Sequence, residues 1–170
     1  MKFKISALLI GLLAFMSACD DLSLINYNMD FATVAMTIDA TENPDTTYVI
    51  ESASIDPKSE LEKNGVSSDL IKKATIKSLT INLESPATGN FNWLKSAKIF
   101  IIGEVQPETE VAMVTEVLPD QKSIEISGID LELTDYIKDG KFSFKLEAIN
   151  DEIIPVDHEV TVTTTFNVEV

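Results

Sequence analysis

The chain has 170 residues, with 13 basic and 28 acidic side chains and a formal net charge of −15. Every basic residue is a lysine, so the chain lacks the guanidinium group that reads guanine or clamps phosphate, and its negative charge repels nucleic acid. One cysteine and one histidine exclude a disulfide framework and a zinc site of His and Cys ligands. We therefore expect no nucleic-acid partner, no metal and no cofactor.

The N-terminus has the pattern of an export signal. Lys2 and Lys4 precede an apolar run over residues 5–16, and small residues then lead to Cys19. The apolar run is shorter than the stretch of about 20 residues that a membrane-spanning helix needs. Cleavage before Cys19 removes Lys2 and Lys4, which leaves 11 lysines against 28 acids and a net charge of −17.

The stretch from Met16 to Cys19 resembles the bacterial lipoprotein box, in which a diacylglyceryl group is attached to the cysteine and a peptidase cuts before it. Met16 stands where leucine is usual. The resemblance implies a signal peptide over residues 1–18 and a lipid anchor on Cys19. The alternative is a plain secretory signal followed by a chance cysteine, but an unpaired exported thiol is a reactive liability, which favours lipidation. Several acyl chains hold a protein firmly, at about 0.8 kcal/mol per buried methylene.

The remaining chain is expected to form a short tether and one domain. We predict a lipidated N-terminus and tether over residues 19–28 and a single domain over residues 29–170. A chain of this length buries about 68–70% of its unfolded surface, which one hydrophobic core supplies. The carboxylates are dispersed along the chain, which is typical of a solvated exterior.

Alternation with period two, broken by turn residues, predicts a mainly β protein. The first strand is predicted over residues 29–38, and the turn Asn43-Pro44-Asp45 follows it. We expect one face of this strand to carry Ala32, Val34, Met36 and Ile38, and the other Phe31, Thr33 and Thr37. The last strand, residues 156–170, alternates apolar side chains, with His158 among them, with polar ones. Each of these strands is predicted to have one core face and one wet face.

The other predicted strands cover residues 48–54, 76–84, 98–105, 110–118, 123–127 and 141–149. Asp56-Pro57 is expected to end the second strand, and short corner helices are expected over residues 67–73 and 131–139. About eight strands without a long amphipathic helix predict an all-β fold, a two-sheet antiparallel β-sandwich. A closed barrel is the main alternative.

The order of the local motifs is similar to that of a known group of lipoproteins. The motifs are the capped turn at 67–73, Phe91-Asn92-Trp93-Leu94, the apolar strand at 99–102, Leu133-Thr134-Asp135-Tyr136-Ile137 and the final Val/Thr-rich strand. They resemble small envelope lipoproteins of Bacteroides-type bacteria with a β-sandwich of the late-embryogenesis-abundant type, over most of residues 29–170. The resemblance implies a domain held on the envelope outside the cytoplasm, with no shared catalytic residues. We expect it to be lipid-anchored to the outer membrane, facing the periplasm or the cell surface, with the inner membrane as the open alternative.

Three short features leave alternatives open. Asp20 and Asp21 are similar to the acidic tether of surface-displayed lipoproteins, although Asp at that place favours inner-membrane retention in enteric bacteria. Asp45-Thr46-Thr47 resembles a short O-glycosylation acceptor. Phe91 and Trp93 form either a lid on the core or a ligand-stacking platform.

The sequence offers little for catalysis. His158 is the only imidazole, its sequence neighbours Asp157 and Glu159 point to the opposite face, and no Gly-x-Ser-x-Gly elbow occurs. We expect His158 to lie at the end of a core stripe with one ring nitrogen on water or a carbonyl. The expected function is a non-enzymatic binding or structural module that contacts an envelope protein through strand edges or loops. The alternative is a carbohydrate-binding or carbohydrate-cleaving accessory protein that stacks sugars on Phe91 and Trp93.

Overall fold

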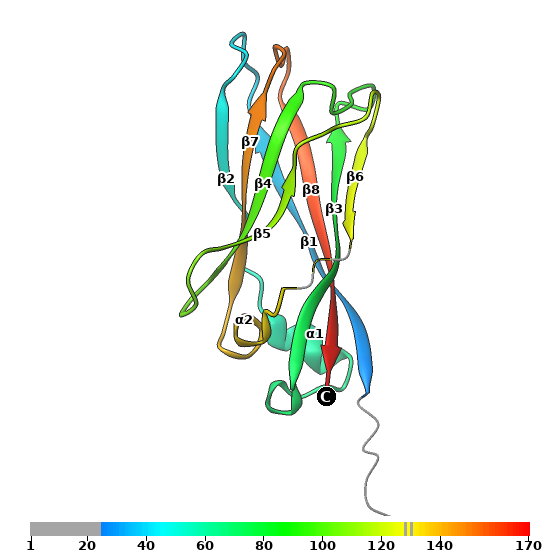
Figure 1. Cartoon of the computed structure of the whole chain (residues 1–170), viewed down its shortest axis with the longest axis vertical. Helices are drawn as coiled ribbons and strands as arrows, with labels where there is room; N and C mark the ends of the chain where they lie inside the picture. The colour runs from blue at the N-terminus through cyan, green and yellow to red at the C-terminus, as the bar shows by residue number, and fades with distance from the viewer. Residues whose placement is uncertain (1–24, 128, 130) are drawn as a thin grey trace, which may run out of the picture.

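The computed structural model describes residues 25–127, 129 and 131–170, and it shows two four-stranded antiparallel sheets packed face to face (Figure 1). The predicted all-β sandwich with eight strands is confirmed. The first sheet has the order β1 (Asn26–Ile38), β8 (His158–Glu169), β3 (Lys73–Ser85), β6 (Ser123–Ser127). The second has the order β2 (Thr47–Glu51), β7 (Phe142–Asn150), β4 (Leu94–Gly103), β5 (Thr109–Val114).

This strand order is that of a jelly roll. Strand 1 pairs with 8, 2 with 7, 3 with 6 and 4 with 5, as in one long hairpin folded on itself. Rolling that hairpin up adds the pairs β3–β8 and β4–β7, which place the strands in two sheets. Because every strand except β5 pairs with one that is distant in sequence, the two halves of the chain form one body.

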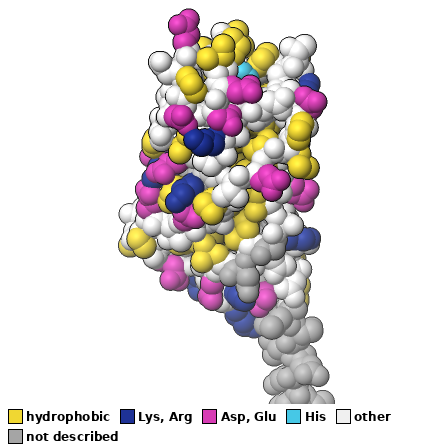
Figure 2. Space-filling view, turned by 45° about the horizontal axis from the view of Figure 1, so that its top comes forward, with side chains coloured by type: hydrophobic (Ala, Val, Ile, Leu, Met, Phe, Trp, Pro, Cys, Tyr) yellow, Lys and Arg dark blue, Asp and Glu magenta, His cyan; other side chains and the backbone are white. Residues whose placement is uncertain are grey.

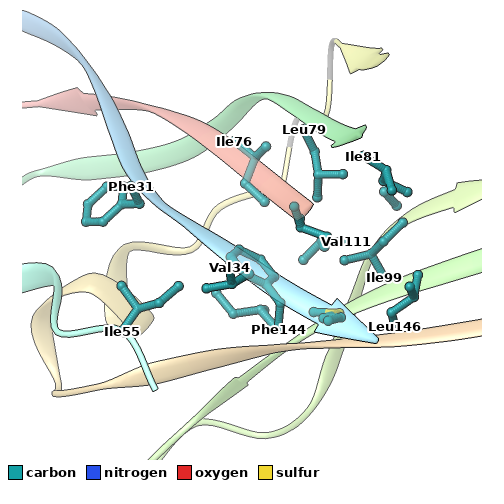
Figure 3. Packing of buried hydrophobic residues seen from close by; sticks show 14 of the residues in the cluster. Phe31, Val34, Ile55, Ile76, Leu79, Ile81, Ile99, Val111, Phe144 and Leu146 are labelled. Carbon is teal, nitrogen blue, oxygen red and sulfur yellow. The ribbon is translucent and has the colours of Figure 1, made fainter. Parts of the chain in front are cut away.

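The core lies between the sheets and is dominated by aromatic and branched side chains (Figure 3). Phe31 of the first sheet meets Phe142 of the second with ring centroids 6.0 Å apart, and it meets Phe166 at 4.8 Å, both edge to face. All three rings are at most 1% exposed. Edge-to-face pairs of this kind add about 0.5–1.5 kcal/mol to the free energy gained by burial.

The predicted faces of the first strand are wrong at Phe31. A register shift between Phe31 and Val34 inserts an extra residue into β1, so that both side chains enter the core although they are three positions apart. The strand also begins at Asn26, opposite Glu169, which places residues 26–28 in the sandwich and not in the tether. The domain therefore starts three residues before the predicted boundary of 29.

The structure contains a helix that the sequence analysis missed. Asp56-Pro57 ends the second strand region as predicted, but it also starts α1 (Pro57–Lys63): the Asp56 carboxylate accepts a hydrogen bond from Lys58 N at 3.0 Å. Asp at the N-cap and Pro at the first helical position suit a helix start as well as a turn. Leu61 is fully buried and packs α1 against the core.

Both predicted corner helices are present in shorter form. The first is a 3₁₀ turn, η1 (Ser68–Leu70), and the second is α2 (Thr134–Lys138), which is followed by Gly140 at φ +139°. The predicted strand over residues 123–127 is confirmed without change. The last strand begins at His158, two residues later than predicted, because Val156 lies half-exposed in the preceding loop.

Candidate functional site

Four loops gather at one end of the sandwich, opposite the end where β1 begins (Figure 1). We call this the loop end; it consists of residues 39–46, 86–93, 115–122 and 151–157. α1, α2, the start of β1 and the C-terminal residue lie toward the other end, which we call the N-terminal end. β1 has 13 residues, so the two ends are about 40 Å apart.

Asn150 fixes two of these loops to each other. Its side chain is fully buried and makes three hydrogen bonds: Oδ1 accepts from Thr46 N at 2.7 Å, and Nδ2 donates to Asn43 O at 3.0 Å and Glu152 O at 2.7 Å. Buried amides are stable only when their polar atoms are paired in this way. The β1–β2 and β7–β8 loops are therefore held in one arrangement.

Asp120 joins the other two loops. Its backbone has φ +60°, and its N–H donates to Asn92 Oδ1 at 2.7 Å. Its carboxylate accepts from Asn90 Nδ2 at 3.1 Å and Asn92 Nδ2 at 3.3 Å. Asn and Asp tolerate such turn conformations because they bond to nearby backbone. The β3–β4 and β5–β6 loops are thus linked as well.

The loop end is strongly acidic. Its four loops contain eight carboxylates and one lysine, Lys122: Asp39, Glu42, Asp45, Glu116, Asp120, Asp151, Glu152 and Asp157. Lys95 at the start of β4 adds an ion pair with Asp45 at 2.5 Å. The hydrogen bond and charge of Asp45 raise the pKa of Lys95 above its usual value. This surface also exposes Leu118, Ile153 and Val156, and so it combines negative charge with apolar side chains.

Phe91 and Trp93 do not form a stacking platform. Phe91 is 1% exposed and Trp93 5%, and their ring centroids are 6.0 Å apart inside the core. A sugar stacks on a ring only where one face is open to solvent, so the stacking interpretation is corrected to the core-lid interpretation. The β3–β4 loop turns both rings inward, where they close the loop end of the core.

His158 has the structural role that its position predicted. It is 4% exposed, and its Nδ1 lies 2.8 Å from Val156 O. Its ring packs edge to face against Trp93 with centroids 5.4 Å apart. The neighbouring Asp157 bonds to the β1–β2 loop: its carboxylate accepts a hydrogen bond from Ala40 N at 2.8 Å.

Within the described part of the chain, the structure contains no group of three or more His, Cys, Asp or Glu that could bind a metal ion. A small gap in the core beside Trp93 and Leu146 is lined by apolar side chains and is no larger than about one water molecule. Among the described helices, none is long and apolar enough to span a bilayer. The predicted signal peptide and Cys19 lie outside the described residues.

Thr46 and Thr47, the candidate glycosylation sites, differ in surroundings. Thr46 is half-buried and its Oγ1 donates to Asn43 O at 2.8 Å, whereas Thr47 is exposed at the start of β2. Nothing in these contacts tests glycosylation, which stays a prediction.

Comparisons with known proteins identify no family for this chain. No family model matches it, and no curated protein matches it. Among solved structures, it is similar to a chain of infectious bursal disease virus, Gt strain, with 19% identity and a TM-score of 0.40 over 98% of this chain and 36% of that chain. It is also similar to a chain of turnip yellow mosaic virus, with 8% identity and a TM-score of 0.29 over 86% of this chain and 94% of that chain.

This chain therefore spans about a third of the bursal disease virus chain that it matches. At TM-scores of this size neither similarity bears on function. What the structure itself defines is a class of protein, a jelly-roll β-sandwich with a closed core and a fixed set of loops at one end.

We predict that Trp93→Ala lowers the free energy of unfolding by about 3–5 kcal/mol, because it empties the volume of a buried ring. Trp93→Phe is the matched control. Phenylalanine keeps most of the ring and lacks Nε1, a buried donor without a partner among the described residues. Trp93→Phe should therefore lower the free energy of unfolding by less than about 1 kcal/mol. Urea unfolding measures both. Unchanged stability in Trp93→Ala would contradict the core-lid role.

We predict that Asn150→Ala lowers the free energy of unfolding by about 2–4 kcal/mol, because it removes three part-buried hydrogen bonds to the backbone of both loops. Amide exchange should rise in residues 43–46, which the side chain of Asn150 orders. Asn167→Ala is the control, since Asn167 lies on an outer face with one contact of 3.4 Å to Asn28. Equal effects of the two substitutions would show that Asn150 does not organise the loops.

Proposed function

We propose that this protein is a non-enzymatic module of the bacterial envelope, held on the outer membrane by a lipid on Cys19, that binds a protein partner through its loop end. The periplasm and the cell surface are both compatible with this role. The resemblance to envelope lipoproteins of Bacteroides-type bacteria supports the proposal and stays a prediction.

The observation that carries the proposal is the placement of the two ends. β1 begins only seven residues after Cys19 and runs the length of the sandwich, so the loops lie about 40 Å from the anchored end. A membrane-held protein meets partners most readily with its far end. The strand order places all four loops at this far end, which is why the loop end suits partner binding.

The order within the loop end also supports binding. A surface that is already fixed loses little conformational entropy when a partner binds, and the contacts of Asn150 and Asp120 fix all four loops. Carboxylates beside Leu118, Ile153 and Val156 match a partner that offers basic groups around apolar ones. On the outer face of the second sheet, by contrast, charged side chains already pair with one another. Lys145 lies 2.5 Å from Glu108 and 2.9 Å from Glu147.

The carbohydrate alternative has lost its main support. It relied on Phe91 and Trp93 as a stacking platform, and both rings are buried. No other contact among the described residues favours it.

We expect Cys19→Ser to abolish acyl labelling and to move the protein from the membrane fraction to the soluble fraction, because the thiol is the only point of lipid attachment. Labelling with a fatty-acid analogue and membrane sedimentation measure the two effects. Ser17→Ala, which leaves the thiol in place, is the control. Unchanged sedimentation of Cys19→Ser would defeat the anchor.

A photo-crosslinking amino acid at Ile153 should give a discrete adduct in living cells, because Ile153 is 57% exposed at the loop end. The matched control is Val49, which is 63% exposed on the edge strand β2. Adducts are measured by their shift on denaturing gels. An adduct from Val49 but not from Ile153 would move the partner site to the sheet edge and contradict the loop-end proposal.

A further inference from the structure

We propose that the N-terminal end of the sandwich is a contact surface for an anionic phospholipid bilayer, which holds the molecule upright with its loop end away from the membrane. The surface consists of Ile25, Leu70, Lys72, Lys73 and Lys138, and we call it the basal patch. This inference rests on the proposed lipidation of Cys19 and adds to it an orientation.

Hydrogen bonds bring the segments of the basal patch together. Val170 N donates to Ile25 O at 3.1 Å, and Lys72 N donates to Glu169 O at 2.8 Å. Lys73 also lies opposite Glu169 in the ladder between β3 and β8. The start of β1, the end of β8 and the segment before β3 therefore form one continuous surface.

The patch combines exposed apolar side chains with lysines. Leu70 is 61% exposed on the η1 turn, and Ile25 is 52% exposed. Lys138 reaches the same turn, because its Nζ donates to Ile71 O at 3.2 Å. Leucine beside lysines is typical of protein surfaces at the membrane interface, where the apolar group enters the acyl boundary and the ammonium groups meet phosphates.

The location of the patch in the fold agrees with this role. The loop that carries Leu70 lies at the lower tip of the described sandwich in Figure 1, close to the start of β1. Figure 2 shows lysine side chains at this lower end, with acidic side chains between them, next to the start of the described chain. No part of the loop end approaches it.

The length of chain before β1 keeps the basal patch near the bilayer. Only residues 20–24 separate Cys19 from Ile25, and six residue steps span at most about 20 Å even when fully extended. This is half the length of the sandwich. A lipid on Cys19 therefore gives the patch a high effective concentration at the surface, so a weak contact is enough to dock it.

Charge favours one orientation over the other. The loop end has eight carboxylates against Lys122, and an anionic surface repels it. Around Leu70, Lys72, Lys73 and Lys138 are mixed with three acids, Asp69, Glu169 and Asp135 of α2, so the basal patch carries no comparable excess of negative charge. An anionic bilayer therefore repels the loop end more strongly than the basal patch.

The test uses two tryptophan probes at matched positions. Leu70→Trp at the basal patch and Leu118→Trp at the loop end replace leucines that are 61% and 58% exposed, each in a Trp93→Phe background. The mature chain from Cys19, which retains the whole core, is coupled through that thiol to a maleimide lipid in phosphatidylglycerol-containing vesicles. Lipids brominated on their acyl chains then quench only a tryptophan that enters the membrane.

We expect quenching at position 70 and none at position 118. Lys72→Glu with Lys73→Glu should lower the ratio of docked to undocked protein about fivefold per lysine removed, whereas Lys122→Glu should not lower it. No quenching at either position, or equal quenching at both, would overturn the proposal. Because the maleimide supplies the tether, failure of the Cys19→Ser experiment defeats the natural anchor alone, and failure here defeats the orientation alone.

Discussion

Packing between the two sheets is the interaction on which the rest of the structure depends. Phe31 comes from the edge strand of the first sheet and Phe142 from the second, and their edge-to-face contact lies in a cluster that extends to both ends of the sandwich. The apolar stripe of each strand is buried mainly by the opposite sheet. The gap between the sheets beside Trp93 and Leu146 has room for no more than about one water molecule.

The sequence predicted the sheets well where alternation was unbroken. Residues 79–83 and 158–168 alternate between two faces, and the structure buries the face that carries the apolar side chains. It failed where one residue breaks the period: the bulge after Phe31 is set by pairing with β8, which local sequence does not encode. It also missed α1, because Asp56-Pro57 is equally a turn and a helix start.

The candidate site was harder to predict, because its residues are distant in sequence. Asn150 bonds to Thr46 across 104 positions, and only the pairing of β2 with β7 brings them together. Trp93 illustrates the same limit. Two aromatic residues in a loop indicate either a lid on the core or a ligand-stacking platform. The direction of their side chains decides between the two, and the turn that Asn92 and Asp120 stabilise sets that direction.

The central claim is that both sheets share one core and therefore behave as a rigid unit between the N-terminal end and the loop end. Native-state hydrogen exchange of β1 and β7 amides tests it most directly, since the two strands lie in different sheets. We predict that the slowest amides in both strands exchange with the same opening free energy, equal to that of global unfolding. Exchange of β1 at a clearly lower free energy than β7 would show that the sheets open separately and would contradict the account.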